Sequence, residues 1–349
     1  MTPPPAPTLD FALPEHLEAH EPPEARGLRR DGVRLLVSYL NSDRIVHARF
    51  VDVPSFLRPG DLVVVNVSAT LPAALTARRS DGSEVTMHLS TQLPAGLVVV
   101  EFRQPGISPG GTLALHGGEA FALPGGGVAL VLVPYPRSTR LWVSRLDLPA
   151  PVLPFLQRWG RPIAYPYVRG RWPIEMYQTV YASTPGSAEM PSAGRPFTPE
   201  ILNRLTLAGV QVATILLHAG VASLEADEPL YEEYFEVSDD TAMTVRRTRK
   251  EGGRVIAVGT TAVRALESAL DAAGRPVASH GWTDLVITSG RGLTVVDGLL
   301  TGFHEPKAAH LAMLEAIVGR PRLERAYGAA LETGYLWHEF GDVHLILPD

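Results

Sequence analysis

The chain of 349 residues contains no cysteine. This absence excludes disulfide bonds, a thiolate nucleophile and cysteine metal ligands, and it fits a reducing compartment. The sequence also lacks any apolar run near the ~20 residues that a membrane span needs. Its first residues, MTPPPAPTLDFALPEH, have no basic start followed by an apolar core, so they predict a short disordered lead rather than a secretory signal. We expect a cytoplasmic protein with no membrane partner.

Lysine is almost absent: Lys250 and Lys307 are the only two, so arginine carries nearly all of the positive charge. The formal net charge of -6 argues against a protein that coats nucleic acid nonspecifically. A local basic patch for a particular RNA remains compatible with this charge.

Several catalytic signatures are missing as well. The chain has no Gly-x-Ser-x-Gly elbow, no Walker phosphate loop and no Gly-x-Gly-x-x-Gly fingerprint. Two histidine pairs, His304 with His310 and His338 with His344, have a spacing of six, whereas a zinc-protease helix needs a spacing of four. We therefore predict no metal site.

Apolar residues make up 45% of the chain and charged residues 19%, which supports a sizeable core and about two domains. Between residues 76 and 148, short apolar runs recur about every ten residues between Gly and Pro. These runs are GLVVVEF, TLALH, GEAFAL and GVALVLV. Their spacing predicts antiparallel strands of a small barrel or sandwich.

The remaining sequence alternates strand and helix patterns. Strands are predicted in VRLLVSYL, IVHARFVDV, GDLVVVN, VQVATILLH and RVIAVGTT. Thr198 as N-cap, Pro199 at the first turn and Gly209 at the end mark one helix, and further helices are predicted from about Asp239 and from Ala262. We predict a discontinuous α/β domain, residues 1–75 and 149–349, with an all-β, barrel-like domain inserted at 76–148.

The stretch RVIAVGTTAVRALESAL is the first candidate site. A buried strand ends at Gly259, which permits close backbone approach, and Thr260 or Thr261 either caps the next helix or leaves its first N–H groups free for an anion. On a helical wheel, Arg264 and Glu267 lie with Ser268 opposite the apolar side, so we expect a polar, solvated face. The alternative is a purely structural role, a capped helix with a surface ion pair.

A second candidate is the irregular segment from Gly160 to Phe197. Its arginines, Arg161, Arg169, Arg171 and Arg195, alternate with Tyr165, Tyr167, Trp172 and Tyr177. Such a segment can stack on bases and contact phosphates of an RNA. An ordered surface loop between domains is the competing interpretation.

Taken in order, these motifs resemble one family. The pieces PGDLVVVN, LPAAL, MYQTVYASTPGSAEMPSAG, LLHAG, EYFEV, VGTTAVRALES, GFHEP and FGD are similar to motifs of the S-adenosylmethionine:tRNA ribosyltransferase-isomerases of queuosine biosynthesis. The resemblance covers nearly the whole chain and is strongest in VGTTAVRALES and YQTVY. It implies an α/β domain that carries an inserted β-barrel.

The resemblance also implies a reaction. Enzymes of this family transfer the ribosyl part of S-adenosylmethionine to the aminomethyl group of a 7-deazaguanine in tRNA and isomerise it, releasing adenine and methionine without a metal. S-Adenosylmethionine is then a substrate, and tRNA is the partner that Arg161, Arg169, Arg171 and Arg195 would contact.

Matching positions imply the site residues. Catalytic or charge-stabilising roles fall to Glu233, Asp342, Arg264 and Glu267. Binding of S-adenosylmethionine falls to the following residues: Gly259, Thr260, Thr261, Arg264, Tyr177, Gln178 and Thr179.

The sequence also departs from the family pattern. Val67-Ser68-Ala69 replaces a motif that ends in arginine, and Arg195-Pro196 replaces Leu-His. Tyr231 stands at a usual histidine, LLHAGVASLEA loses a glycine and an aromatic residue, and GFHEP replaces Asn-Phe-His-Leu-Pro. Polar groups in a water-excluded site are individually worth large rate factors, so these changes bear on activity.

Three hypotheses follow. The chain is a tRNA-modifying ribosyltransferase in which residues such as Arg195 or His338 compensate for the lost groups. Alternatively, it is a paralogue that uses S-adenosylmethionine with another, small-molecule acceptor. The third is a noncatalytic module that binds a ligand or RNA, for which binding without adenine release would be the mark.

Overall fold

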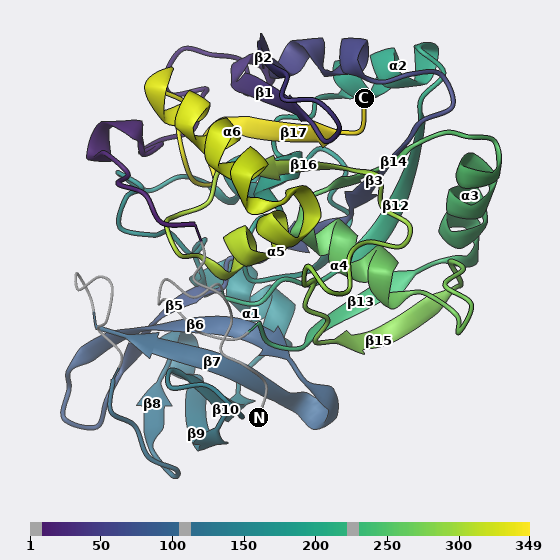
Figure 1. The fold of residues 1–349 in the computed structure, drawn as a ribbon. Helices are drawn as coiled ribbons and strands as arrows, with labels where there is room; N and C mark the ends of the chain where they lie inside the picture. The colour runs from purple at the N-terminus through teal and green to yellow at the C-terminus, as the bar shows by residue number, and fades with distance from the viewer. Residues whose placement is uncertain (1–8, 105–112, 222–229) are drawn as a thin grey trace.

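A computed structural model describes residues 9–104, 113–221 and 230–349. Within these ranges, a large mixed sheet with helical cover adjoins a closed antiparallel barrel (Figure 1). The predicted fold class, an α/β domain with an inserted all-β barrel, is therefore confirmed. The boundaries at residues 76 and 148 stay a proposal, since the barrel strands run from Ala74 to Asp147 and α1 packs on the barrel core.

The described part of the main sheet has the strand order β15-β13-β12-β3-β14-β16-β17-β1-β2. The four central strands, β12, β3, β14 and β16, are parallel to one another. The bounds are β1 (Arg34–Tyr39), β2 (Ile45–Arg49), β3 (Leu62–Asn66), β12 (Gln211–Leu217), β13 (Glu233–Val237), β14 (Val255–Val258), β15 (Ser279–Thr283), β16 (Gly298–Gly302) and β17 (Val343–Leu347). A two-stranded sheet pairs β4 (Ser68–Thr70) with β11 (Thr184–Ser187).

The barrel closes in the order β10-β7-β6-β5-β8-β9. Its strands are β5 (Ala74–Arg78), β6 (Glu84–Gln92), β7 (Leu97–Arg103), β8 (Ala120–Ala122), β9 (Val128–Pro134) and β10 (Leu141–Asp147). The predicted strand TLALH is wrong for residues 113–116, which form no strand; Thr112 lies outside the described residues. The helices described between β5 and β10 are short 3-10 turns, η4 (Pro94–Gly96) and η5 (Pro124–Gly126).

The α-helices are α1 (Val152–Trp159), α2 (Pro199–Leu207), α3 (Asp239–Lys250), α4 (Thr260–Ser268), α5 (Ala309–Val318) and α6 (Arg320–Glu332). Further 3-10 turns are η1 (Glu15–Leu17), η2 (Arg30–Gly32), η3 (Phe50–Phe56), η6 (Ile174–Tyr177) and η7 (Ser192–Gly194). The predicted strand IVHARFVDV is wrong after Arg49, where η3 begins. The cap prediction is confirmed, because the Thr198 side chain accepts a hydrogen bond from the Ile201 N–H. No helix in the described ranges is long and apolar enough to cross a membrane.

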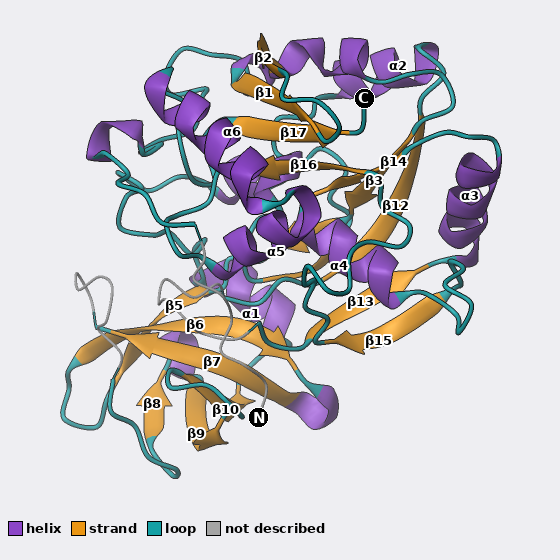
Figure 2. Cartoon of the chain, viewed as in Figure 1, coloured by secondary structure: helices purple, strands orange, loops and turns teal. Residues whose placement is uncertain are grey.

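Both faces of the main sheet are covered (Figure 2). Along β3, Leu62 and Val64 pack in the core shared with α3, α4, α5 and α6, whereas Val63 and Val65 pack in the core shared with η3 and α2. Successive side chains of a strand point to opposite faces, so a continuous apolar run marks a strand buried on both.

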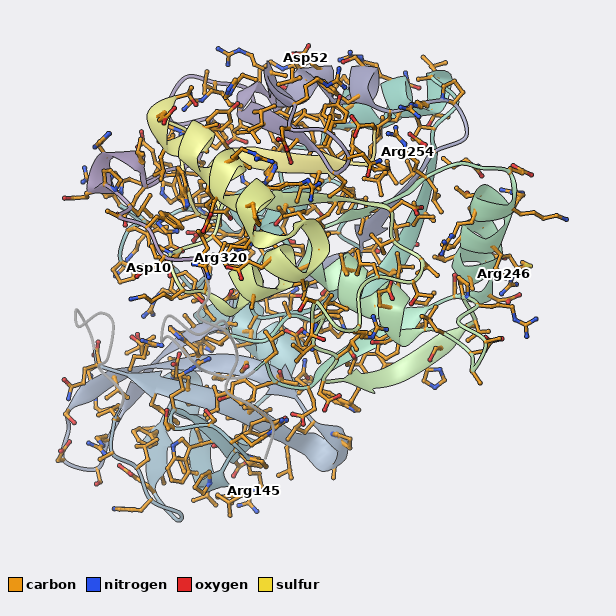
Figure 3. All side chains as sticks on the ribbon, viewed as in Figure 1. Asp10, Asp52, Arg145, Arg246, Arg254 and Arg320 are labelled. Atoms are coloured by element: carbon orange, nitrogen blue, oxygen red, sulfur yellow. The ribbon has the colours of Figure 1, made fainter. Side chains whose placement is uncertain are left out.

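Ionic contacts secure the start of β14. Arg254 donates to both carboxylate oxygens of Asp61, at 2.6 Å from Nη2 to Oδ2, and both side chains are buried. Figure 3 shows Arg254 inside the main domain, in contrast to Arg145 at the outer edge of the barrel. This ion pair holds the strand that leads into the candidate site.

The N-terminal lead departs from its prediction. Residues 1–8 lie outside the described residues, but Leu9 is buried, and Phe11 and Leu13 pack against the main core. These apolar side chains account for the order of residues 9–16, because their burial offsets the entropy of ordering the segment.

Candidate active site

A pocket of about 270 Å³ lies where the main sheet meets the barrel. The loops that follow β14 and β16 form one side, and Ser90 and Thr91 of β6 form part of the other. Parallel strands present their carboxyl ends at the same edge, which is where open α/β sheets bind ligands. Other polar and titratable residues of the lining include Arg140, Tyr165, Tyr167, Tyr177, Glu189, Tyr231, Glu232, Glu233, Thr261, Arg264, His304, Glu305, His310, His338 and Glu339.

The N-terminus of α4 opens into this pocket. Gly259 is its N-cap with φ +84°, a conformation that favours glycine, and no side chain caps the helix. Thr260 and Thr261 line the pocket, and the buried Thr261 Oγ1 has no hydrogen-bond partner in the described part of the protein. Free N–H groups and the helix dipole make this end suited to an anion.

Arg264 and Glu233 form an ion pair in the pocket wall. Arg264 also donates to the carbonyl oxygens of Leu285, Tyr231 and Thr283, at 2.9 to 3.2 Å. The other carboxylate oxygen of Glu233 accepts from the Gly220 N–H at 2.9 Å. These contacts use four of the five N–H donors of the arginine, and both members of the ion pair line the pocket.

The expected solvated face of α4 is wrong. Arg264 is 4% exposed and Glu267 2% exposed, because the segment after α4 folds back over this side of the helix. Glu267 accepts from the backbone N–H groups of Thr294, Val295 and Val296 and from Arg291. It does not line the pocket, and its contacts are those of a residue that holds a loop.

Asp342 also lies behind the pocket rather than in its wall. Its oxygens accept from the backbone N–H groups of Arg34 at 2.6 Å and Leu336 at 2.8 Å, and from Arg34 Nε at 3.2 Å. Burial raises the pKa of this carboxyl above its usual value, while the backbone hydrogen bonds and Arg34 act in the opposite direction. The contacts join β1 to the loop before β17.

Of the three predicted residues in the YQTVY motif, the structure brings Tyr177 into the pocket lining and leaves two outside. Gln178 clamps the backbone of Thr70, accepting from its N–H at 3.0 Å and donating to its carbonyl at 2.8 Å. Thr179 is buried, and its Oγ1 has no partner among the described residues. The motif thus connects the irregular segment to β4.

Two His-Glu dipeptides, His304-Glu305 and His338-Glu339, form part of the pocket wall. The ring of His338 stacks on Tyr167, with centroids 3.6 Å apart. The His338 Nδ1 lies 3.5 Å from Glu305 Oε1, and the Tyr167 hydroxyl donates to Glu339 at 2.7 Å. In the sequence, the only local sign of this wall is the His-Glu pair that occurs in both GFHEP and LWHEF.

Burial changes the protonation of this wall. It raises the pKa of Glu305 to about 7, with the Glu339 and Glu18 carboxylates acting in the same direction, and it raises that of Glu339. It lowers the pKa of His338 to about 4 and that of His310 to about 4. The histidines are therefore neutral at pH 7, and Glu305 keeps its proton to a higher pH than an ordinary carboxyl group does.

The four arginines predicted to contact RNA differ in their exposure. Arg169 and Arg171 are exposed, and Arg161 is half-buried and donates to Thr76 and Thr86. Arg195 is 2% exposed and donates to Glu24 Oε2 at 2.8 Å and to the carbonyl of Met176, so it is unavailable to RNA in this conformation.

The aromatic part of the RNA prediction changes as well. Tyr177 is buried against Phe340, and Tyr167 packs inward on His338, so neither ring is presented to bases on the surface. Among the described residues, no group of three or more His, Cys, Asp or Glu is arranged to hold a metal ion.

The fold and pocket define a class: an α/β protein that binds a small ligand at the carboxyl ends of its parallel strands, beside an inserted barrel. A sequence model of the family described as queuosine biosynthesis protein matches residues 7–346. The chain belongs to this family.

Its relatives agree with that assignment. The S-adenosylmethionine:tRNA ribosyltransferase-isomerase of Thermus thermophilus is 38% identical, over 97% of this chain and 98% of its own length. The enzyme of the same name from Gloeobacter violaceus is 35% identical, over 98% and 95%. The crystal structure of S-adenosylmethionine tRNA ribosyltransferase from Thermotoga maritima has 30% identity and a TM-score of 0.54, covering 97% of this chain and 99% of that one.

Proposed function

We propose that this protein transfers the ribosyl group of S-adenosylmethionine to the aminomethyl group of a 7-deazaguanine in tRNA and isomerises it, releasing adenine and methionine. The observation that carries the proposal is the uncapped N-terminus of α4, which faces a pocket beside the Glu233 carboxylate. S-Adenosylmethionine carries one carboxylate and two cationic groups, so it needs both kinds of partner.

In this proposal the methionine carboxylate lies at Gly259, Thr260 and Thr261. The first N–H groups of α4 and the unpartnered Thr261 hydroxyl supply donors, and the helix dipole favours the negative charge. Glycine is required at position 259 by its φ of +84°, since a Cβ there would make only ordinary contacts, 3.4 Å from Thr261 Oγ1 and 3.8 Å from the Ala193 Cβ.

Glu233 receives a cationic part of the substrate, the sulfonium or the α-ammonium. Its charge is held in place by Arg264 and the Gly220 N–H, so it cannot rotate away. Arg264 is thus a positioning residue, and Glu267 and Asp342 act further out by fixing the segments that carry the pocket wall.

The reaction needs few groups. The sulfonium acidifies the adjacent 5′ carbon and is a good leaving group, so the protein must hold the pose, exclude water and manage protons. Tyr177 and the stacked Tyr167 and His338 rings give the pocket an apolar wall that restricts water.

The tRNA acceptor is supported by the exposed Arg169 and Arg171 in the segment that borders the pocket. Such an acceptor places the enzyme in the cytoplasm. The alternative, a paralogue with a small-molecule acceptor, is supported by the burial of Arg195, which therefore does not replace the missing motif arginine at Ala69.

The test is release of adenine and methionine from S-adenosylmethionine by purified protein, with and without tRNA that carries the aminomethyl deazaguanine. Release only with that tRNA is the expected result. Release with a small-molecule extract but not with the tRNA would favour the paralogue, and binding without release would identify a noncatalytic module.

A further inference from the structure

The part of the pocket wall that includes Tyr167 and His338 contains a carboxylate that the proposed function has not used. Glu305 follows β16, and His338 lies in the loop between α6 and β17. Both line the pocket, and the His338 Nδ1 lies 3.5 Å from Glu305 Oε1. Four separate parts of the chain, which contribute Glu18, Tyr167, Glu305 and His338, converge here.

His338 is held in a demanding position. Its side chain is 4% exposed, its φ is +73°, and its Nε2 is buried without a hydrogen-bond partner among the described residues. The left-handed region is uncommon for a residue with a Cβ and is concentrated at functional sites. The Tyr167 ring, stacked at 3.6 Å, fixes the plane of the imidazole.

Three other carboxylates that line the pocket have identified donors. Glu339 accepts from the Tyr167 hydroxyl, Glu233 from Gly220 and Arg264, and Glu232 from Tyr135 and Arg137. Glu305 differs from these three residues. Among the described residues, the neighbour of its carboxylate is the His338 imidazole. Its oxygens are therefore available to a ligand.

The electrostatic surroundings of Glu305 favour proton uptake. The titratable groups around this wall are Glu339, Glu18, His338, His20, His304 and Tyr167. The two carboxylates and burial together raise the pKa of Glu305 to about 7, and burial keeps His338 neutral at that pH. Lys307, which is close in sequence, pairs with Asp10 at 3.1 Å.

We propose that Glu305, oriented beside His338, is the base that takes the proton from the acceptor's primary ammonium group. This inference rests on the proposed function and names the residue that activates the nucleophile. One N–H bond of the ammonium breaks, one O–H bond forms on Glu305, and the electron pair stays on nitrogen as the lone pair of the neutral, nucleophilic amine. The carboxyl groups of Glu305 and Glu339 also attract the ammonium before the transfer.

The test is the pH dependence of adenine release in a single turnover, at saturating S-adenosylmethionine, between about pH 5.5 and 9.5. The variants are Glu305→Gln, which keeps the shape, and Glu305→Asp, which keeps a carboxylate. Glu119→Gln on the barrel is the control, because Glu119 is also a half-buried carboxylate but lies outside the pocket, paired with Arg79. Affinity for S-adenosylmethionine is measured in parallel.

The wild-type rate should rise with pH, reach half of its maximum near pH 7, and level off at higher pH. Glu305→Gln should lose about 100-fold at neutral pH, and the loss should shrink at high pH as the amine deprotonates in solution. Glu305→Asp should retain the pH-dependent rise of the rate. Neither variant should change the affinity for S-adenosylmethionine by more than about threefold. A merely structural role would give a loss that does not depend on pH.

A wild-type pH profile in Glu305→Gln would overturn this inference and leave the proposed function standing. Absence of adenine release from the wild type with its tRNA would instead overturn the proposed function, and this inference with it.

Discussion

Arg264 of α4 and Glu233 of β13 form an ion pair that joins the helix to the wall of the pocket. The arginine is 4% exposed and also donates to three backbone carbonyl oxygens of the surrounding loops. The pair therefore connects the stability of the main domain to the geometry of the site.

Arg264→Ala should destabilise the main domain by about 3–5 kcal/mol, because it leaves the Glu233 carboxylate and three carbonyl groups without their partner. Denaturant unfolding measures the change. Arg145→Ala on the barrel, where the side chain is exposed, should stay within about 0.5 kcal/mol of the wild type. Equal stability of both variants would show that the ion pair is dispensable.

Glu267→Gln should lower the free energy of unfolding by about 3 kcal/mol, since a neutral side chain no longer balances Arg291 and its amide meets the backbone N–H groups of Thr294 and Val295. Hydrogen exchange should accelerate first in that segment. Glu324→Gln, at an exposed ion pair on α6, is the control. If exchange at Thr294 and Val295 is unchanged, Glu267 does not hold the loop.

Thr261→Val should weaken binding of S-adenosylmethionine by about tenfold to a hundredfold, because the variant removes a donor to a charged carboxylate. Folding should be almost unaffected, since the hydroxyl has no protein partner among the described residues. Thr248→Val is a matched control: its Oγ1 is likewise buried and unpartnered, but on α3, away from the pocket. Isothermal titration calorimetry measures the affinity of both variants for S-adenosylmethionine. Equal affinities would show that the carboxylate of S-adenosylmethionine does not bind at the N-terminus of α4.

Reversing Arg169 and Arg171 to glutamate should weaken tRNA binding and reduce its dependence on salt, because fewer counterions are released. Both side chains are exposed. Arg247→Glu on α3 serves as a control for charge alone. Filter binding over a range of salt concentrations measures the slope, and an unchanged slope would argue for a small acceptor.

Local sequence signals predicted much of the fold. The Thr198 cap, the apolar run of β3 and the short barrel strands depend on neighbours in sequence or on burial of whole strands. The polar side of α4 was misplaced because a helical wheel shows which residues share a face. It does not show that the chain from Thr283 to Val296 returns to cover that face.

The candidate site was predictable only in part. Gly259, Thr260 and Thr261 follow directly from a strand-to-helix junction. The wall formed by Tyr167, Glu305 and His338 depends instead on contacts between segments that are distant in sequence. Spacing along the chain carries little information about such contacts. The two His-Glu dipeptides marked the positions but not their convergence.

The most direct test of the central claim uses S-adenosylmethionine that carries ¹³C in every ribose carbon, followed by mass spectrometry of nucleosides from the acceptor tRNA. The account predicts a deazaguanosine product that contains the complete labelled ribosyl skeleton, formed together with free adenine. Adenine release that leaves the tRNA without label would contradict it, because the ribosyl group would then have gone to another acceptor.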